Sequence, residues 1–264
     1  MLASGIESTM KEEMKKNATK QRDAGVWRTE ALRLTAFTDL AVQTESLADW
    51  NSLVGRPPAQ RNSQIAIKQV EEFGPFGKGV LAINASPGRI DLQYQPILDV
   101  ATLGNTWPDI GSLPESLEEF VPLALKWLDM TPSLRRLAFG AEVSIPASNH
   151  DEAYKLLDFY LPAVSIDLTT TDFNYAINRK RPSSSNISGL IVNRLSRWYA
   201  LARRFMVKKP DGIAATVEFL VCRLELDINT GPEFATDLPK DKHKDIFHEL
   251  VSFAVEIAEK GDVP

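Results

Sequence analysis

The sequence predicts an α+β fold of two mostly antiparallel sheet subdomains, with helices packed on one face of each sheet and a helix at the C-terminus. Successive extended segments are joined by short turns, which is typical of antiparallel strands. Helical periodicity is confined to a few stretches, and the last of them closes the chain. A loop rich in glycine, proline and asparagine at 103–114 divides the chain. We therefore expect a flexible tail at 1–25, an N-terminal subdomain at 26–112 and a C-terminal subdomain at 113–264.

Length and composition are those of an ordinary globular protein. The chain has 264 residues, of which 44% are hydrophobic and 25% are charged, so apolar burial can offset the entropy lost on ordering. Cys222 is the only cysteine, which excludes a disulfide scaffold. No apolar run approaches the ~18 residues that a membrane span needs, and no apolar leader follows Met1. We expect a cytoplasmic protein with no membrane partner.

The sequence pattern of the N-terminal half predicts strands interrupted by one short helix. Alternating apolar residues in 31–42 predict a strand. Residues 44–55 predict a helix that begins at a threonine N-cap and ends at a glycine followed by prolines. Residues 64–73 and 79–95 predict further strands, and the Ser-Pro-Gly sequence at 86–88 predicts a hairpin turn within the second of them.

The C-terminal half carries three helical patterns. The first spans about 115–130 and has one apolar face. Asn149 and Glu152 form the pattern of a capping box that opens a second, short helix. The third pattern spans about 241–259 and ends at a glycine. Its apolar residues recur every three or four positions: Ile246, Leu250, Phe253 and Ile257.

Extended segments fill the rest of this half, but one of them is ambiguous. The expected segments are 134–145, 163–177, 190–201 and 216–228. Residues 190–206 also fit a helix, since apolar residues recur there at steps of four and three. A strand period is poorer, because Arg194 and Ser196 share a parity with Trp198. Periodicity alone favours a helix.

Charge is distributed unevenly along the chain. The net charge is −5, yet the basic segment 173–209 contains nine basic and no acidic residues. A block of one sign creates a local field, and guanidinium groups beside aromatic rings are suited to holding phosphates and stacking bases. The candidate binding residues are Arg179, Arg181, Arg194, Arg197, Trp198 and Tyr199.

These arginines have a second interpretation, in which they pair with the chain's own carboxylates. Residues 225–264 contain ten acidic and four basic residues. If this stretch packs nearby, the balance of charge favours internal pairing over a ligand. A nucleic acid, another anionic ligand and an acidic protein partner stay open as alternatives, with nucleic acid not favoured.

Several patches resemble a sporadically distributed family of uncharacterised bacterial proteins. They are the Ile-Asn-Arg triplet at 177–179, the Asn-Arg-Leu triplet at 193–195 followed by Trp198, and the ending 224–260, a strand with acidic residues followed by a loop and a helix. Members of that family are often found in mobile or defence-associated gene neighbourhoods. The resemblance implies a two-part α+β protein in which 190–201 is a strand, and it supplies no catalytic residues.

Known catalytic and metal-binding patterns are absent from the sequence. His243 and His248 lie five residues apart, or roughly 140° around a helix, so they do not form the pair that a zinc helix needs. Cys222 stands among large apolar residues and is expected to be buried. No phosphate-binding loop or nucleophile-elbow motif occurs. Glu225 and Asp227 share one face of a strand and are expected to point outward.

We therefore expect a non-enzymatic binding or accessory protein, part of a bacterial defence or toxin–antitoxin-like system, with a basic face for an anionic or protein partner. We assign it no catalytic residue, cofactor or metal ligand. The alternative is a nucleic-acid-acting enzyme that uses Glu225 and Asp227 with neighbouring arginines. An enzyme needs converging carboxylates in a cleft, whereas a binding protein needs only an exposed face.

Overall fold

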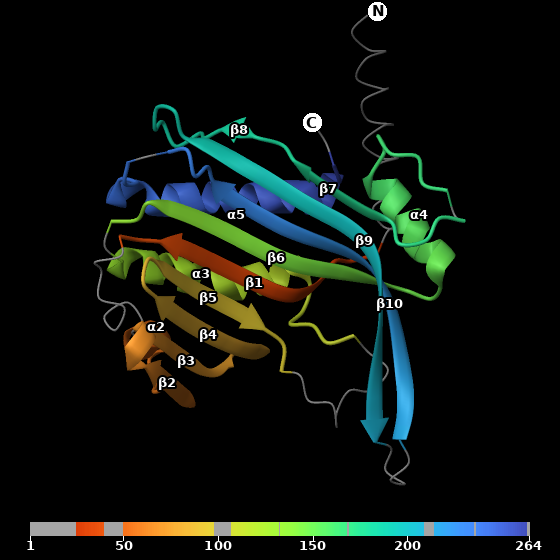
Figure 1. Cartoon of the computed structure of the whole chain (residues 1–264), viewed down its shortest axis with the longest axis horizontal. Helices are drawn as coiled ribbons and strands as arrows, with labels where there is room; N and C mark the ends of the chain where they lie inside the picture. The colour runs from red at the N-terminus through yellow and green to blue at the C-terminus, as the bar shows by residue number, and fades with distance from the viewer. Residues whose placement is uncertain are drawn as a thin grey trace, which may run out of the picture.

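Strands from both halves of the chain pair into one antiparallel sheet of ten strands (Figure 1). The computed structural model describes residues 25–39, 50–97, 107–131, 133–167, 169–208, 214–234 and 236–262. The strands are β1 (Arg28–Phe37), β2 (Gln60–Gln64), β3 (Gln69–Phe76), β4 (Gly79–Ser86), β5 (Arg89–Gln95), β6 (Arg136–Ala147), β7 (Asn174–Asn178), β8 (Arg181–Pro182), β9 (Ile191–Lys208) and β10 (Ala214–Thr230). The helices are α2 (Trp50–Val54), α3 (Leu113–Met130), α4 (His150–Tyr160) and α5 (His243–Lys260). The predicted α+β class with antiparallel pairing is confirmed.

The two expected sheets are joined edge to edge, and β1 makes the junction. The strand order is β2-β3-β4-β5-β1-β6-β10-β9-β7, and β8 pairs with β9. Leu34 of β1 lies opposite Leu92 of β5 on one side and opposite Phe139 of β6 on the other. The expected separation into two sheets is therefore corrected to one continuous sheet. Sequence patterns indicate which face of a strand is buried, but they do not indicate which strands pair with it.

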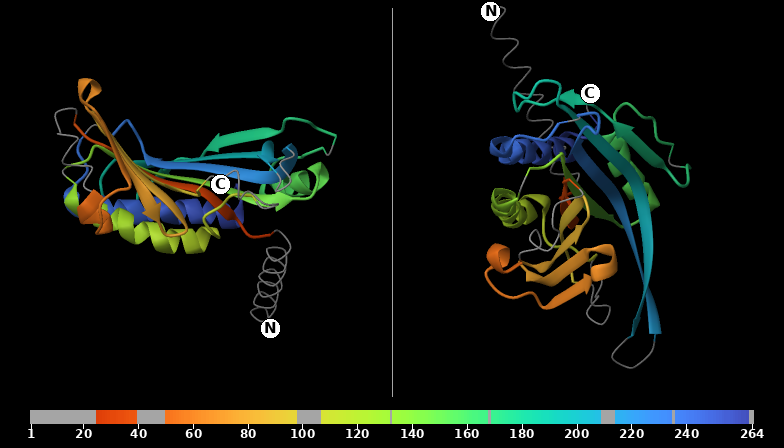
Figure 2. Two further views of the ribbon diagram at one scale, coloured as in Figure 1. Left: turned by 90° about the horizontal axis from the view of Figure 1, so that it is seen from below. Right: turned by 60° about the vertical axis from the view of Figure 1, so that its left-hand side comes forward.

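The described helices cover one face of this sheet and leave the other face open (Figure 2). α3 packs against β1, α5 against β6 and β10, and α4 against β9 and β10. α2 packs on α3 at the β3 end, where the backbone nitrogen of Trp50 donates to the buried Glu72 carboxylate at 3.0 Å. Every second side chain of the central strands therefore lies on the open face, where some of them, such as Arg223 and Ser144, are covered by their neighbours.

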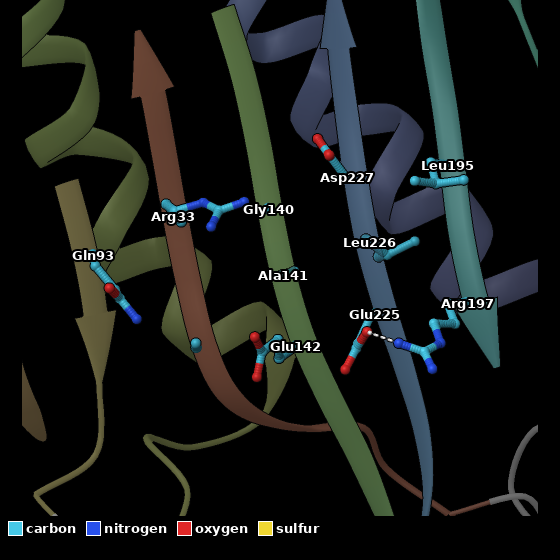
Figure 3. A pocket seen from close by; sticks show the side chains of 11 residues that line it. Arg33, Gln93, Gly140, Ala141, Glu142, Leu195, Arg197, Glu225, Leu226 and Asp227 are labelled. Carbon is cyan, nitrogen blue, oxygen red and sulfur yellow. Dashed lines mark ion pairs between the residues drawn. The ribbon is translucent and has the colours of Figure 1, made fainter. Parts of the chain in front are cut away.

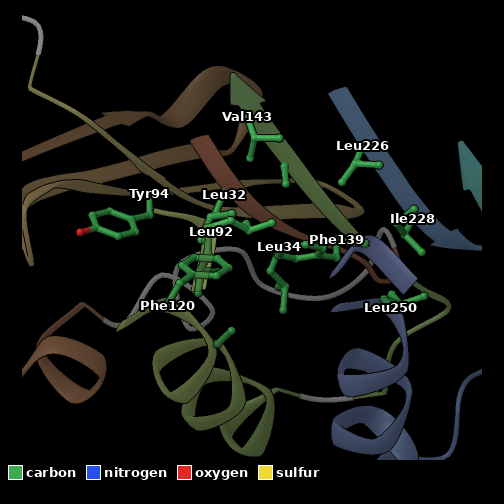
Figure 4. Packing of buried hydrophobic residues seen from close by; sticks show 14 of the residues in the cluster. Leu32, Leu34, Leu92, Tyr94, Phe120, Phe139, Val143, Leu226, Ile228 and Leu250 are labelled. Carbon is green, nitrogen blue, oxygen red and sulfur yellow. The ribbon is translucent and has the colours of Figure 1, made fainter. Parts of the chain in front are cut away.

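Apolar side chains fill the space between the sheet and its helices (Figure 4). Leu34 and Phe139 from the central strands are fully buried there, as are Phe120 of α3 and Leu250 of α5. The ring of Phe139 meets Phe247 edge-on, with centroids 5.9 Å apart. The predicted stripe of the C-terminal helix is confirmed at Ile246, Leu250 and Ile257, which are buried, while Phe253 is partly buried against the same core.

The ambiguous segment is a strand, so the helical periodicity of 190–206 is misleading. β9 pairs with β10 along its whole length and with β7 on its other side. Arg194, Ser196 and Trp198 all point toward the helices, and all three are buried. The strand period is hidden because two of the inward-facing side chains are polar.

Several local predictions are confirmed. Ser86 and Arg89 face each other across the β4–β5 turn. The backbone nitrogen of Glu152 donates to Asn149 Oδ1 at 2.9 Å and opens α4. Other predictions shift or lie outside the described residues. The strand expected at 163–177 begins only at Asn174. The predicted tail at 1–25, apart from Gly25, and the predicted N-cap at 44 lie outside the described residues.

The β9–β10 hairpin is longer than the rest of the sheet (Figures 1 and 2). β10 pairs with β6 only from Leu220 onward, so the residues before it pair with β9 alone. At the base of this extension, the Arg203 guanidinium lies 5.5 Å from the centroid of the Trp107 ring. The hairpin extends the sheet beyond the part that the helices cover.

Candidate functional site on the open face of the sheet

The central strands present charged and polar side chains on the open face. A pocket of about 320 Å³ lies there, in the size range of small-ligand sites (Figure 3). Its lining residues come from β1, β5, β6, β9 and β10: Ala31, Arg33, Gln93, Gly140, Ala141, Glu142, Leu195, Arg197, Glu225, Leu226 and Asp227. Alternation along each strand explains this arrangement, since the intervening side chains form the core.

Arg223 of β10 lies at one end of the pocket and holds three carboxylates. Its side chain is buried, and its Nη1 lies 2.9 Å from Glu30 Oε2. Its Nη2 contacts Glu142, and its Nε lies 3.5 Å from Glu225 Oε1. Burial raises the pKa of Glu30, and the Arg223 charge opposes that rise. Glu142 and Glu225 are direct cross-strand neighbours, so the shared cation offsets their repulsion.

Glu225 is further engaged from β9. The Tyr199 hydroxyl donates to Glu225, and Arg197 Nη1 lies 3.6 Å from the other carboxylate oxygen. Burial, together with this hydrogen bond, raises the pKa of Tyr199, so the phenol stays protonated. The Arg197 guanidinium lies 5.0 Å from the centroid of the Tyr199 ring and donates to Asn174 at 3.1 Å. The Glu225 carboxylate is therefore held in place by Tyr199 and Arg197.

Arg33 and Asp227 lie in the same pocket but are not engaged in this way. Within the described residues, the Arg33 guanidinium forms no ion pair, and its covered Nε has no hydrogen-bond partner. Asp227 accepts a hydrogen bond from Asn229 at 3.1 Å and forms no ion pair in the described chain. Gly140 lies between them on β6, opposite Arg33 on one side and opposite Asp227 on the other.

Three of the predicted binding arginines lie on the helix-covered side and pair internally. Arg179 donates to Asp262 at 2.6 and 2.9 Å. Arg181 and Arg194 share Glu256, at 3.1 and 3.0 Å. Hydrogen bonding to Arg179 holds the pKa of Asp262 below its usual range. For these three arginines the structure agrees with internal pairing, the second interpretation of the sequence.

The six predicted binding residues do not form one surface. Trp198 is fully buried and stacks on Tyr160, with ring centroids 5.6 Å apart, so its ring is not available as a platform for bases. Arg197 and Tyr199 lie on the open face instead. The expected single basic face is corrected for a physical reason: in a strand, successive residues point to opposite sides.

Sequence reasoning found part of this site and missed the rest. Glu225 and Asp227 point outward with the predicted parity, while Leu224, Leu226 and Ile228 are buried. Arg33, Gln93 and Glu142 were missed because they come from strands whose pairing the sequence does not reveal. The available signal is the alternation in β1, where Arg33 and Thr35 stand between the apolar residues Leu32, Leu34 and Ala36.

Reactive groups elsewhere fit a structural role. Cys222 is fully buried, and burial raises the pKa of its thiol. Among the described residues, no group of three histidine, cysteine or acidic side chains is arranged to hold a metal ion.

No helix in the described ranges is long and apolar enough to cross a membrane. No protein-family model and no curated protein matches this chain.

Proposed function

We propose that this chain is a non-enzymatic binding protein that holds its partner on the open face of the sheet. One observation carries the proposal: a pocket lined by side chains of five strands lies on the face that the described helices leave uncovered. Ion pairs that only stabilise the fold would not need a pocket of this size beside them. The mixed signs of its lining favour a partner that carries both charges, or a protein segment, over a nucleic acid.

The charge balance of the open face supports this choice. Arg33, Arg197 and Arg223 stand among Glu30, Glu142, Glu225 and Asp227, so the pocket and its surroundings are not basic overall. A nucleic-acid surface needs a continuous excess of positive charge. Three of the four arginines that suggested such a surface, Arg179, Arg181 and Arg194, are paired on the other side of the sheet.

An enzyme that acts on nucleic acids is the second candidate, because Glu142, Glu225 and Asp227 line one pocket. Two of these carboxylates are held by Arg223, and Glu225 also by Tyr199. Such contacts fix carboxylates but leave fewer oxygens for a metal ion. Hydrolysis of single-stranded or duplex DNA in the presence of Mg²⁺, lost in Glu225→Gln, would replace the binding proposal with this one.

The binding proposal is tested by filling the pocket. A Cβ at Gly140 would lie 3.4 Å from an Arg33 Nη atom, so Gly140→Ala adds an ordinary contact and Gly140→Val displaces the guanidinium. Native mass spectrometry of protein recovered from its host should show a bound partner on the wild type and on Gly140→Ala but not on Gly140→Val. Arg181→Gln, on the helix-covered side, should retain the partner. A partner lost from Arg181→Gln but kept by Gly140→Val would contradict the proposal.

Membership of a defence locus rests on the family resemblance alone and stays a prediction. The genes adjacent to this one test it directly.

A further inference from the structure

We infer that the open-face pocket binds a zwitterion of the α-amino acid class, with its carboxylate at Arg33 and its ammonium at Asp227. This inference rests on the proposed function and names the ligand class of the same pocket. The residues that carry it form one row across five strands: Gln93, Arg33, Gly140, Asp227 and Leu195.

The row places a cation and an anion on either side of a residue without a side chain. Arg33 and Asp227 are each direct cross-strand neighbours of Gly140. Neighbouring strands lie about 4.8 Å apart, so the two backbones are separated by about 10 Å. In Figure 3 both side chains extend from their strands toward β6. The Arg33 guanidinium reaches over Gly140, where a Cβ would lie 3.4 Å from one of its nitrogens, so the missing side chain at Gly140 lets this cation face the Asp227 side of the pocket.

Both charged groups lack an ionic partner in the described chain, whereas their neighbours have one. Arg223 binds Glu30 and Glu142, and Arg197 lies near Glu225. Arg33 and Asp227 are left as one positive and one negative charge that form no ion pair with each other in the described chain. A ligand with a single negative charge would satisfy Arg33 but would also meet the carboxylates. A zwitterion satisfies both ends.

The rest of the row and the size of the pocket agree with a small ligand. About 320 Å³ is at the lower end of the range for small-molecule sites. Beyond Asp227, Leu195 of β9 is 38% exposed, although its strand is paired on both sides. It offers an apolar contact for an aliphatic part of the ligand. At the other end of the row, Gln93 is the cross-strand neighbour of Arg33 and lines the pocket, and its amide nitrogen donates to Gln95 Oε1 at 2.9 Å.

Calorimetric titration with each of the twenty standard amino acids tests the inference directly. We expect at least one to bind at millimolar or lower concentration. Its analogue without the amino group and its analogue without the carboxylate should each bind about tenfold more weakly or worse, since each loses one charge-assisted contact. Arg33→Met and Asp227→Asn should each weaken binding by a similar factor. Arg89→Met, on the same face but outside the row, should bind like the wild type.

Arg33→Lys guards against a folding defect, because it keeps the positive charge and should retain part of the affinity. The inference is overturned if no amino acid binds the folded wild type, if the analogue without an amino group binds equally well, or if Asp227→Asn has no effect. If no amino acid binds but Gly140→Val still releases a partner, only this inference falls. If no amino acid binds and Gly140→Val does not release a partner, the proposed function is overturned as well.

Discussion

Arg194 is a buried guanidinium whose charge depends on one acceptor. Its side chain is 1% exposed, and its Nη2 donates to Glu256 Oε2 at 3.0 Å. Burial lowers the pKa of Arg194, the nearby Arg181 charge lowers it further, and Glu256 opposes both effects. In the described chain, its Nε and Nη1 have no hydrogen-bond partners, although the guanidinium lies 5.1 Å from the Phe253 ring centroid. Glu256 therefore stabilises a charge that would otherwise be buried without compensation.

Glu256→Gln should destabilise the protein by about 3–5 kcal/mol, since it leaves Arg194 buried without a counter-ion. Arg194→Met should cost less, because it removes the buried charge and keeps most of the volume. Urea denaturation measures both, with the exposed Glu259→Gln as control on the same helix. A Glu256→Gln variant as stable as Glu259→Gln would show that the buried charge does not depend on this ion pair.

His243 makes stability depend on pH. It is fully buried, its Nε2 lies 3.1 Å from the Leu238 carbonyl oxygen, and burial lowers its pKa. The unfolded chain, with a histidine pKa of about 6.5, therefore binds a proton at a higher pH than the folded chain does. The stability contributed by neutral His243 is complete above about pH 6.5 and is lost as the pH falls toward the folded pKa.

His243→Gln should reduce this pH dependence. Between about pH 6.5 and 5, the wild type should lose up to ~1.4 kcal/mol per pH unit from this group, and the variant should lose less. The variant is expected to be less stable at pH 7, because the imidazole packing is lost. Melting temperatures across this range measure the effect, and the exposed His248→Gln is the matched control. Equal slopes for the two variants would contradict the assignment.

At the scale of elements, α5 contributes to the core through one side. Leu250 is fully buried between the helix and the sheet, whereas Ser252 is exposed. Leu250→Ala should cost about 2–5 kcal/mol through lost burial and the cavity left behind. Ser252→Ala should change stability by less than about 0.5 kcal/mol. Chemical denaturation of the two variants gives both values, and an unchanged stability for Leu250→Ala would remove α5 from the core.

Sequence patterns predicted helices and strands well where the buried residues are apolar and the exposed residues are polar. The stripe of α5 and the Asn149 N-cap of α4 were found because each depends on residues close together in the sequence, although the Glu152 carboxylate accepts from Ser148 and so does not complete the predicted capping box. β9 was ambiguous because Arg194 and Ser196 point inward, where a strand pattern requires apolar residues. Their polarity is explained by Glu256 and by the Trp198 indole, which donates to the Ser196 hydroxyl at 3.1 Å. Those partners are distant in sequence or on the same strand, and no periodicity reveals them.

The candidate site was predicted less completely than the fold for the same reason. Glu225 and Asp227 were placed outward by their parity alone, which is a local property of β10. Arg33 and Gly140 join them only through the register of β1 on β6 and of β6 on β10. Register between strands far apart in sequence depends on the assembled core, so the row across the open face could not be predicted.

At the scale of the whole molecule, the halves share both their sheet and their core. β1 lies between β5 and β6, so it forms hydrogen bonds with both halves. The Trp27 ring contacts Tyr160 and Trp198, with centroid distances of 5.0 and 6.0 Å, and its Nε1 donates to the Ala258 carbonyl oxygen at 2.8 Å. A side chain next to the first strand is thus packed among elements of the last hundred or so residues.

Because the core is shared, we expect the chain to unfold in one cooperative transition. Calorimetry should give equal calorimetric and van't Hoff enthalpies, as for a two-state protein. Residues 113–264 expressed alone should fail to fold stably, since β6 would lose β1 and Trp198 would lose Trp27. Trp27→Ala in the full chain should lower the single melting temperature without splitting the transition, with a cost of about 3–5 kcal/mol. Two resolved transitions, or a stably folded 113–264 fragment, would instead support the two subdomains expected from the sequence and would mean that the β1–β6 junction contributes little to stability.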